Sequence, residues 1–320
     1  MKSSRKCAKS VSREREKGRI ILKIIFMGTP DFAVKSLSKL FKDGHIILAV
    51  FSGADKVRGR GKTLSFSPVK QFAVSNNIPV YEPSEMTAEL ISELRADLIA
   101  VVAYGRLLTQ EILDIPPLGC INIHGSLLPK YRGAAPVQHA VLNGDAITGV
   151  TSMYMAKEMD SGDIIYTNET AILPDETSED LFNRLSVMGA QLLSKTVLDI
   201  SAGTAPRRAQ DHQNATYAPM LTKDMARIDF SKSAKEIKCK VRALVPWPVA
   251  EAEIAGKLFK IYCVDITDNK INEPCGTVIT DNKTKIEVVA GEGTVIIEKL
   301  QAAGGKILTA SEFLRGNKLK

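Results

Sequence analysis

Residues 119–136 read GCINIHGSLLPKYRGAAP, in which Asn122 and His124 alternate with Ile121 and Ile123. Alternate side chains of a β-strand point to the same face, so the amide and the imidazole would project together. The isoleucines predict a strand buried in an α/β sheet, and the Gly-Ser turn that follows ends it where such sheets bind ligands. The segment therefore predicts both a fold class and a catalytic pair.

Apolar runs of strand length alternate with helical patterns on both sides of this segment. The alternation predicts an α/β domain with a doubly wound, Rossmann-like, mostly parallel sheet. We expect strands at 20–27, 46–51, near 80, at 97–102 and at 149–155, and helices at 30–43, 67–75, 88–94, 136–142 and 178–198.

The pattern changes beyond residue 228, where one helix is followed by short strands separated by turns. Short, evenly spaced strands favour a small β-barrel. We expect the helix at 233–244 and the strands at 249–254, 257–264, 275–280, 284–290 and 294–300. The predicted organisation is a basic tail without fixed structure at 1–19, a catalytic domain at 20–200, a linker at 201–228 and a C-terminal domain at 229–320.

Composition and charge narrow the class of protein. The 320 residues are 44% hydrophobic and 25% charged, and no apolar run is long enough to span a membrane. The formal net charge is +7, and residues 207–320 carry 19 Lys and Arg against 14 Asp and Glu. This excess favours a polyanionic partner such as RNA, with an ordinary solvated surface as the alternative. The five cysteines form no C-x-x-C pair, so we expect reduced thiols and no metal site.

The segment 119–136 resembles the signature of the folate-dependent formyltransferase family. The family pattern is Asn-x-His, then Ser-Leu-Leu-Pro, then Arg-Gly, and this chain matches it at Asn122, His124, 126–129 and 132–133. The family's third catalytic residue, an aspartate before Ser-Gly-Asp, is matched by Asp160. Residues 24–34, 101–108 and 217–230 are similar to the branch that acts on initiator methionyl-tRNA.

This resemblance implies the transfer of a formyl group from 10-formyltetrahydrofolate to the α-amine of methionine on initiator tRNA. Such a transfer passes through a tetrahedral oxyanion, which needs hydrogen-bond donors and a route for protons. Asn122 and a protonated His124 would donate to the oxyanion, and Asp160 would stabilise the imidazolium while a water carries the amine proton away. The folate pocket would be walled by Ser126, Leu127, Leu128 and Pro129. The C-terminal domain would be of OB type.

A glycine-rich basic loop at 53–63 follows the strand at 46–51. A solvated loop is the ordinary interpretation, but a loop at this end of a sheet can reach a phosphate backbone beside the active site. The resemblance implies that it docks the tRNA acceptor end, although Ala54 and Val57 stand where the family commonly has proline, and Met220 where it has a basic residue. The candidate tRNA contacts are Arg58, Arg60, Lys62 and Lys223.

Other functions remain open at this point. A related formyltransferase acts on a sugar nucleotide or on a purine-precursor amine, and a protein of another class would be a non-catalytic RNA-binding module. We expect a monomer without membrane contact. Its expected location is the bacterial cytoplasm, with the mitochondrial matrix as the weaker alternative.

Overall fold

The computed structural model describes residues 14–16, 19–58 and 63–319, whose contacts form two compact units. Unit 1 comprises Met1–Gly133, Gly149–Glu169 and Asn183–Tyr217, and unit 2 comprises Ala134–Thr148, Thr170–Phe182 and Ala218–Lys320. Strand β1 (Glu14–Glu16) pairs antiparallel with β2 (Arg19–Ile21). The remainder of the predicted tail lies outside the described residues.

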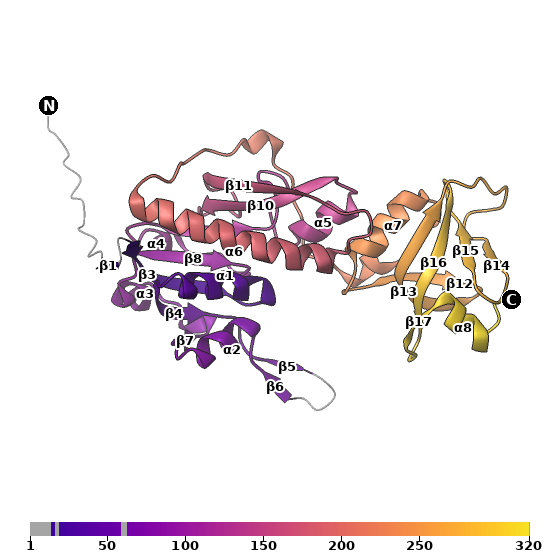
Figure 1. The fold of residues 1–320 in the computed structure, drawn as a ribbon, viewed down its shortest axis with the longest axis horizontal. Helices are drawn as coiled ribbons and strands as arrows, with labels where there is room; N and C mark the ends of the chain where they lie inside the picture. The colour runs from indigo at the N-terminus through magenta and orange to yellow at the C-terminus, as the bar shows by residue number, and fades with distance from the viewer. Residues whose placement is uncertain (1–13, 17–18, 59–62, 320) are drawn as a thin grey trace. The chain divides into compact units, whose positions relative to one another are not determined.

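Unit 1 is built on a seven-stranded sheet with the order β11-β10-β9-β8-β3-β4-β7 (Figure 1). The five strands from β9 to β7 are parallel, and β10 runs antiparallel to β9. The predicted doubly wound, mostly parallel sheet is thereby confirmed. The bounds are β3 (Lys23–Gly28), β4 (Ile46–Phe51), β7 (Val80–Tyr81), β8 (Leu98–Val102), β9 (Cys120–His124), β10 (Ile147–Tyr154) and β11 (Ile164–Ala171).

Helices cover both faces of this sheet because alternate apolar side chains of the central strands point to opposite sides. On one face Ile25 of β3 packs with Ile91 of α3 and Ile112 of α4. On the other face α1 contacts β3, β4 and β8, and Gly189 of α6 lies against Ile123 of β9. The helices are α1 (Asp31–Lys42), α2 (Pro68–Ser75), α3 (Ala88–Leu94), α4 (Gln110–Leu113) and α6 (Ser178–Ala202).

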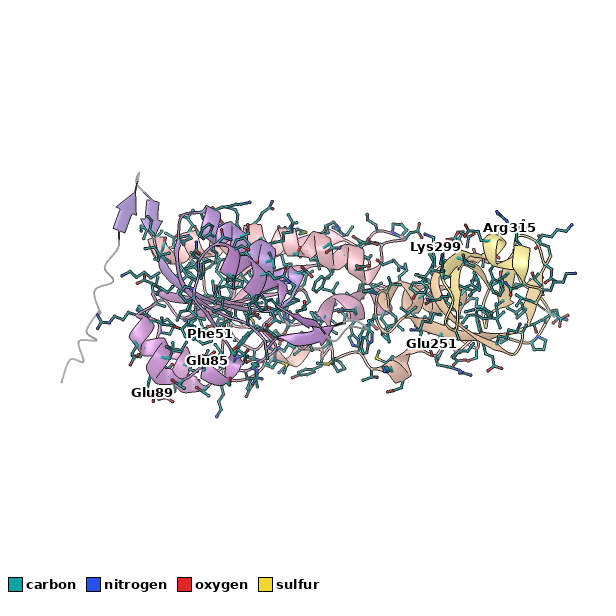
Figure 2. All side chains as sticks on the ribbon, turned by 90° about the horizontal axis from the view of Figure 1, so that it is seen from below. Phe51, Glu85, Glu89, Glu251, Lys299 and Arg315 are labelled. Carbon is teal, nitrogen blue, oxygen red and sulfur yellow. The ribbon has the colours of Figure 1, made fainter. Side chains whose placement is uncertain are left out.

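Side-chain distribution in unit 1 follows this layering (Figure 2). Phe51 is fully buried and stacks on Tyr81 with 5.3 Å between ring centroids, whereas Glu85 and Glu89 are exposed. Two short strands, β5 (Lys56–Arg58) within the predicted loop at 53–63 and β6 (Thr63–Ser65) at its end, pair antiparallel. A hairpin therefore follows β4 at the carboxyl end of the parallel strands.

Unit 2 is built on an antiparallel sheet with the order β12-β13-β16-β15-β14, and β17 pairs with β16. A bulge in β13 between Ile261 and Val264 bends the strand, which favours the curled, barrel-like form seen in Figure 1. The predicted C-terminal barrel class is confirmed in this form, while β17 and α8 were not predicted. The bounds are α7 (Ala234–Ala243), β12 (Ala250–Ile254), β13 (Lys257–Thr267), β14 (Val278–Thr280), β15 (Ile286–Val289), β16 (Thr294–Ala302), β17 (Ile307–Thr309) and α8 (Ala310–Gly316).

Two segments from the middle of the chain complete unit 2. Helix α5 (Pro136–Leu142) packs on α7. The Ser178 hydroxyl lies 2.8 Å from the carbonyl oxygen of Ala243 and 2.7 Å from that of Val245. Arg242 donates from Nη1 to the carbonyl oxygens of Leu173 and Glu176. Hydrogen bonds thus join the end of α7 to residues that precede it by more than sixty positions.

Candidate functional site

Strand β9 positions the two polar side chains of the predicted pair. Cys120, two residues before Asn122, lies on the same face of β9, and its thiol is within 4.0 Å of the carbonyl oxygen of Ile112 in α4. Burial raises the pKa of this thiol to about 12, so it stays protonated at neutral pH. Asn122 and His124 continue the same face toward the carboxyl end of the strand, where the sheet leaves room for polar groups.

The loop between β10 and β11 brings Asp160 to this pair. Its Oδ1 lies 3.5 Å from Nδ2 of Asn122, and its Oδ2 lies 3.6 Å from Nδ1 of His124. The amide of Gly133 donates to Oδ2 at 2.8 Å. The side chains of His124 and Asp160 are only 6% and 13% exposed. The structure therefore places all three predicted catalytic residues together, although 36 positions separate Asp160 from His124.

The hydrogen bonds of His124 decide which ring nitrogen faces the carboxylate. Its Nε2 lies 2.8 Å from the carbonyl oxygen of Tyr131, which can only accept, so Nε2 carries a hydrogen. Nδ1 therefore faces Asp160, and a hydrogen on Nδ1 makes the ring an imidazolium. The distance between His124 Nδ1 and Asp160 Oδ2 exceeds that of a hydrogen bond, so both atoms can still bond to another group.

This arrangement can stabilise negative charge on a reacting oxygen. The amide of Asn122 is a neutral donor, and a protonated His124 is a charge-assisted one. The Asp160 carboxylate is close enough to both to balance a positive imidazolium. Donors fixed in a buried position are worth more than the same donors in water, because they need no reorganisation during the reaction.

The turn after β9 holds the four residues predicted to wall the folate pocket. Ser126 is fully buried, and its hydroxyl donates to the carbonyl oxygen of Lys130 at 2.6 Å. Leu128 packs against Met153 and Ile164, and its amide donates to Oγ1 of Thr151 at 3.2 Å. Leu127 and Pro129 remain partly exposed. These two offer the apolar surface that a pocket wall requires.

The predicted tRNA contacts are described only in part. Arg58 ends strand β5, and Lys223 is exposed at the start of the 3₁₀ turn Lys223–Ala226 in unit 2. Arg60 and Lys62 lie outside the described residues. Residues 56–58 and 63–65, on either side of these positions, pair antiparallel.

Sequence reasoning missed one buried residue beside the site. Gln210 is 5% exposed and donates from Nε2 to the carbonyl oxygens of Asp160 and Gly162, at 2.8 and 2.7 Å. Its Oε1 accepts from Nη2 of Arg132 at 2.7 Å. Gln210 lies in the predicted linker, where no periodic pattern marks it as buried. Arg132 stands in the signature itself and is 4% exposed.

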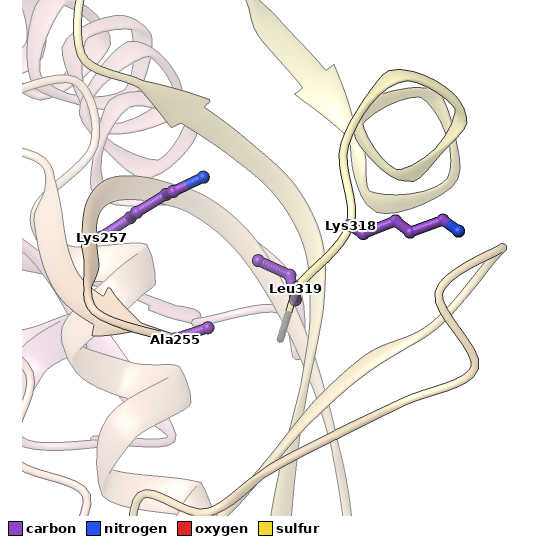
Figure 3. Close-up of a pocket in the computed structure, with 4 residues that line it drawn as sticks. All are labelled: Ala255, Lys257, Lys318 and Leu319. Carbon is purple, nitrogen blue, oxygen red and sulfur yellow. The ribbon is translucent and has the colours of Figure 1, made fainter.

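A pocket in unit 2 has a different character (Figure 3). It is lined by Ala255, Lys257, Lys318 and Leu319, and the Lys318 side chain extends away from Leu319. None of these residues supplies a carboxylate or an imidazole.

Residues 14–16, 19–58 and 63–319 offer neither a metal-binding cluster nor a membrane-spanning helix. No group of three or more His, Cys, Asp or Glu side chains there is placed to hold a metal ion. No helix there is long and apolar enough to cross a membrane.

Two known sequence families match this chain. The family described as formyl transferase matches residues 22–197, and the family described as formyl transferase, C-terminal domain, matches residues 220–318. The first match contains Asn122, His124 and Asp160. The second contains Lys223 and every strand of the curled sheet of unit 2, from β12 to β17.

Named relatives and solved structures agree with these matches. A protein of Acetivibrio thermocellus named methionyl-tRNA formyltransferase is 43% identical over 93% of this chain and 97% of its own length, and one of Clostridioides difficile with the same name is 42% identical over 93% and 98%. A Helicobacter canadensis N-formyltransferase, solved with folinic acid and dTDP-3-aminofucose, has the same fold, with a TM-score of 0.68, 21% identity and coverage of 87% and 99%. Because the family match spans more than half of the chain and the relatives exceed 40% identity, the chain belongs to the formyl transferase family, in the branch of the proteins named methionyl-tRNA formyltransferase.

Proposed function

We propose that the protein transfers the formyl group of 10-formyltetrahydrofolate to the α-amine of methionine on initiator tRNA. The observation that carries the proposal is the convergence of Asn122, His124 and Asp160 within 3.6 Å in a chain 43% identical to a methionyl-tRNA formyltransferase. We further propose that it acts in the bacterial cytoplasm, since the named relatives are bacterial, and that it is a monomer.

In this reaction a bond forms between the methionine nitrogen and the formyl carbon, and the bond from that carbon to N10 of the folate breaks. Asn122 and protonated His124 donate to the oxygen on which negative charge develops. Asp160 holds the imidazolium and, through a water, accepts the proton that leaves the amine. The same proton is returned to N10, so the products are formylmethionyl-tRNA and tetrahydrofolate. No covalent enzyme intermediate is needed.

The folate substrate fits the chemistry of the turn after β9. The partly exposed Leu127 and Pro129 supply apolar surface for a ring, and the neighbouring backbone is fixed by the bonds from Thr151 to Ser126 and Leu128. A rigid wall would hold the formyl carbon in a fixed position relative to Asn122. Fixed orientation of the reacting groups lowers the activation barrier.

The proposal is tested by measuring formyl transfer to charged initiator tRNA, charged elongator tRNA and a dTDP-amino sugar. We expect initiator methionyl-tRNA to be the preferred acceptor by kcat/KM. A faster reaction with the amino sugar would contradict the proposal and favour the sugar-nucleotide activity. Binding of tRNA without turnover of any acceptor would favour a non-catalytic RNA-binding module.

A second prediction concerns Arg60. We expect Arg60→Leu to lower formylation of tRNA far more than it changes folate binding, because a contact with phosphate or the acceptor end positions the amine without touching the donor. Lys35→Leu, which removes an exposed cation from α1, serves as the control. Equal kcat/KM for the Arg60 variant and the parent would show that Arg60 makes no contact that formylation of tRNA requires.

A further inference from the structure

The backbone of the loop that carries Asp160 is strained and tightly packed. Asp160 has a φ of +50°, in the left-handed region that is unfavourable for residues other than glycine. A Cβ added to Gly162 would lie 1.8 Å from the carbonyl oxygen of Tyr154, so the loop passes directly against the end of β10. A loop under these constraints keeps one conformation only where other groups hold its backbone.

Gln210 supplies that support from a distant part of the chain. Its Nε2 donates to the carbonyl oxygens of Asp160 and Gly162, which flank Ser161. Both bonds are short, and the bond to Gly162 is buried. Gln210 therefore fixes the backbone on both sides of the bend from which the Asp160 carboxylate projects.

Arg132 decides which end of the Gln210 amide faces the loop. Its Nη2 and Nε lie 2.7 and 3.3 Å from Oε1 of Gln210, and a guanidinium can only donate. The oxygen of Gln210 must therefore face Arg132, and its nitrogen must face the loop. His212 accepts from the same Nη2 through Nδ1 at 3.1 Å, which holds the guanidinium in place.

We propose that Arg132 and Gln210 form a buried brace that positions the Asp160 carboxylate for the reaction. The brace rests on the proposed function, and Gln210 is a positioning residue because it contacts the Asp160 backbone and no reacting atom. Its effect is expressed in kcat, since Asp160 acts on charge that develops during the reaction. The linker-like segment after α6 is thus part of the active site.

The variant Gln210→Glu separates this role from simple filling of space. A glutamate keeps an acceptor for Arg132 but has no hydrogen to donate to the two carbonyl oxygens of the loop. We expect Gln210→Glu and Gln210→Met to lower kcat alike, by on the order of 10- to 100-fold, with nearly unchanged KM values. If Gln210 served only to satisfy Arg132, Gln210→Glu would keep the parental kcat, and that result would overturn the brace.

A double-mutant comparison and a structural readout complete the test. In the Asp160→Ala background, we expect Gln210→Glu to lower kcat no further, because the two residues act through one group. The Gly133 amide, which donates to Asp160 Oδ2, should exchange its hydrogen faster in Gln210→Glu than in the parent. Unchanged exchange at Gly133, or additive losses of kcat, would each contradict the proposal.

Gln301→Glu is the matched control. Gln301 also accepts through Oε1, from Tyr262 at 2.9 Å, and donates through Nε2, to Gly305 at 2.9 Å, but it lies in unit 2. We expect parental kcat and Gly133 exchange in this variant. Because Gly133 exchange needs no turnover, a parent protein that formylates no tRNA would refute the proposed function while the exchange data still decide on the brace.

Discussion

We expect His124→Ala to lower kcat for formyl transfer by on the order of 100-fold or more, because removing one donor from an oxyanion site typically costs that much. In the proposed mechanism the donor is Nδ1, which faces Asp160, because Nε2 is bonded to the Tyr131 carbonyl oxygen. Folate binding should persist, since the ring contributes mainly to charge that develops during the reaction. The measurement is steady-state kinetics with charged initiator tRNA, together with folate binding by calorimetry.

His139→Ala is the control for this substitution. His139 lies in α5 and bonds through Nε2 to the carbonyl oxygen of Pro219 in unit 2. Its replacement should leave kcat close to the parental value. The double variant His124→Ala/Asp160→Ala should lose less kcat than the product of the two single losses predicts, because the two residues act as one unit. A folded His124→Ala protein with near-parental kcat would exclude the proposed mechanism.

Gly162→Ala should be strongly damaging, although it adds only one methyl group. The new Cβ would lie 1.8 Å from the Tyr154 carbonyl oxygen and 2.9 Å from its carbonyl carbon. Both are backbone atoms, which cannot move away by a change of rotamer as a flexible side chain can. Overpacking of this kind typically costs about 1–3 kcal/mol of stability. The displaced loop also carries Asp160, so we expect a loss of kcat on the order of 100-fold.

The matched control is Gly316→Ala. Gly316 ends α8, and an added Cβ there meets nothing within 4 Å. Because alanine favours the helical conformation over glycine, we expect unchanged or slightly raised stability and parental activity. Thermal unfolding and kinetics of the two variants give the comparison. Similar melting temperatures and similar kcat for both would show that the loop at Gly162 yields easily.

The sequence predicted the elements whose patterns are local. Helices α3 and α5 have the predicted bounds, and β9 carries the polar pair on one face as its alternation indicated. Strand β11 was missed because its last six residues, Tyr166–Ala171, are largely polar and give no apolar run. Helix α4 is a single turn, too short for a period of 3.6 to be recognised.

The candidate site shows the same limit at the level of single residues. Asp160 was identified because a family pattern surrounds it, and only the fold could bring it to Asn122. Gln210 had no such pattern: its loop partners precede it by 48 and 50 positions, and a lone glutamine between polar neighbours resembles an exposed residue. Periodicity predicts that a side chain is buried, but not which distant backbone it bonds.

The packing of α5 on α7 bears on how this protein can be divided or recombined. The residues of unit 2 come from three stretches, and the chain passes between the units at residues 133–134, 148–149, 169–170, 182–183 and 217–218. A gene fragment that begins at Ala218 would omit α5 and the segment that satisfies the end of α7. A single recombination event therefore cannot transplant the complete C-terminal unit onto another catalytic domain. The C-terminal unit is therefore inherited together with residues 134–148 and 170–182, which are interleaved with the catalytic unit.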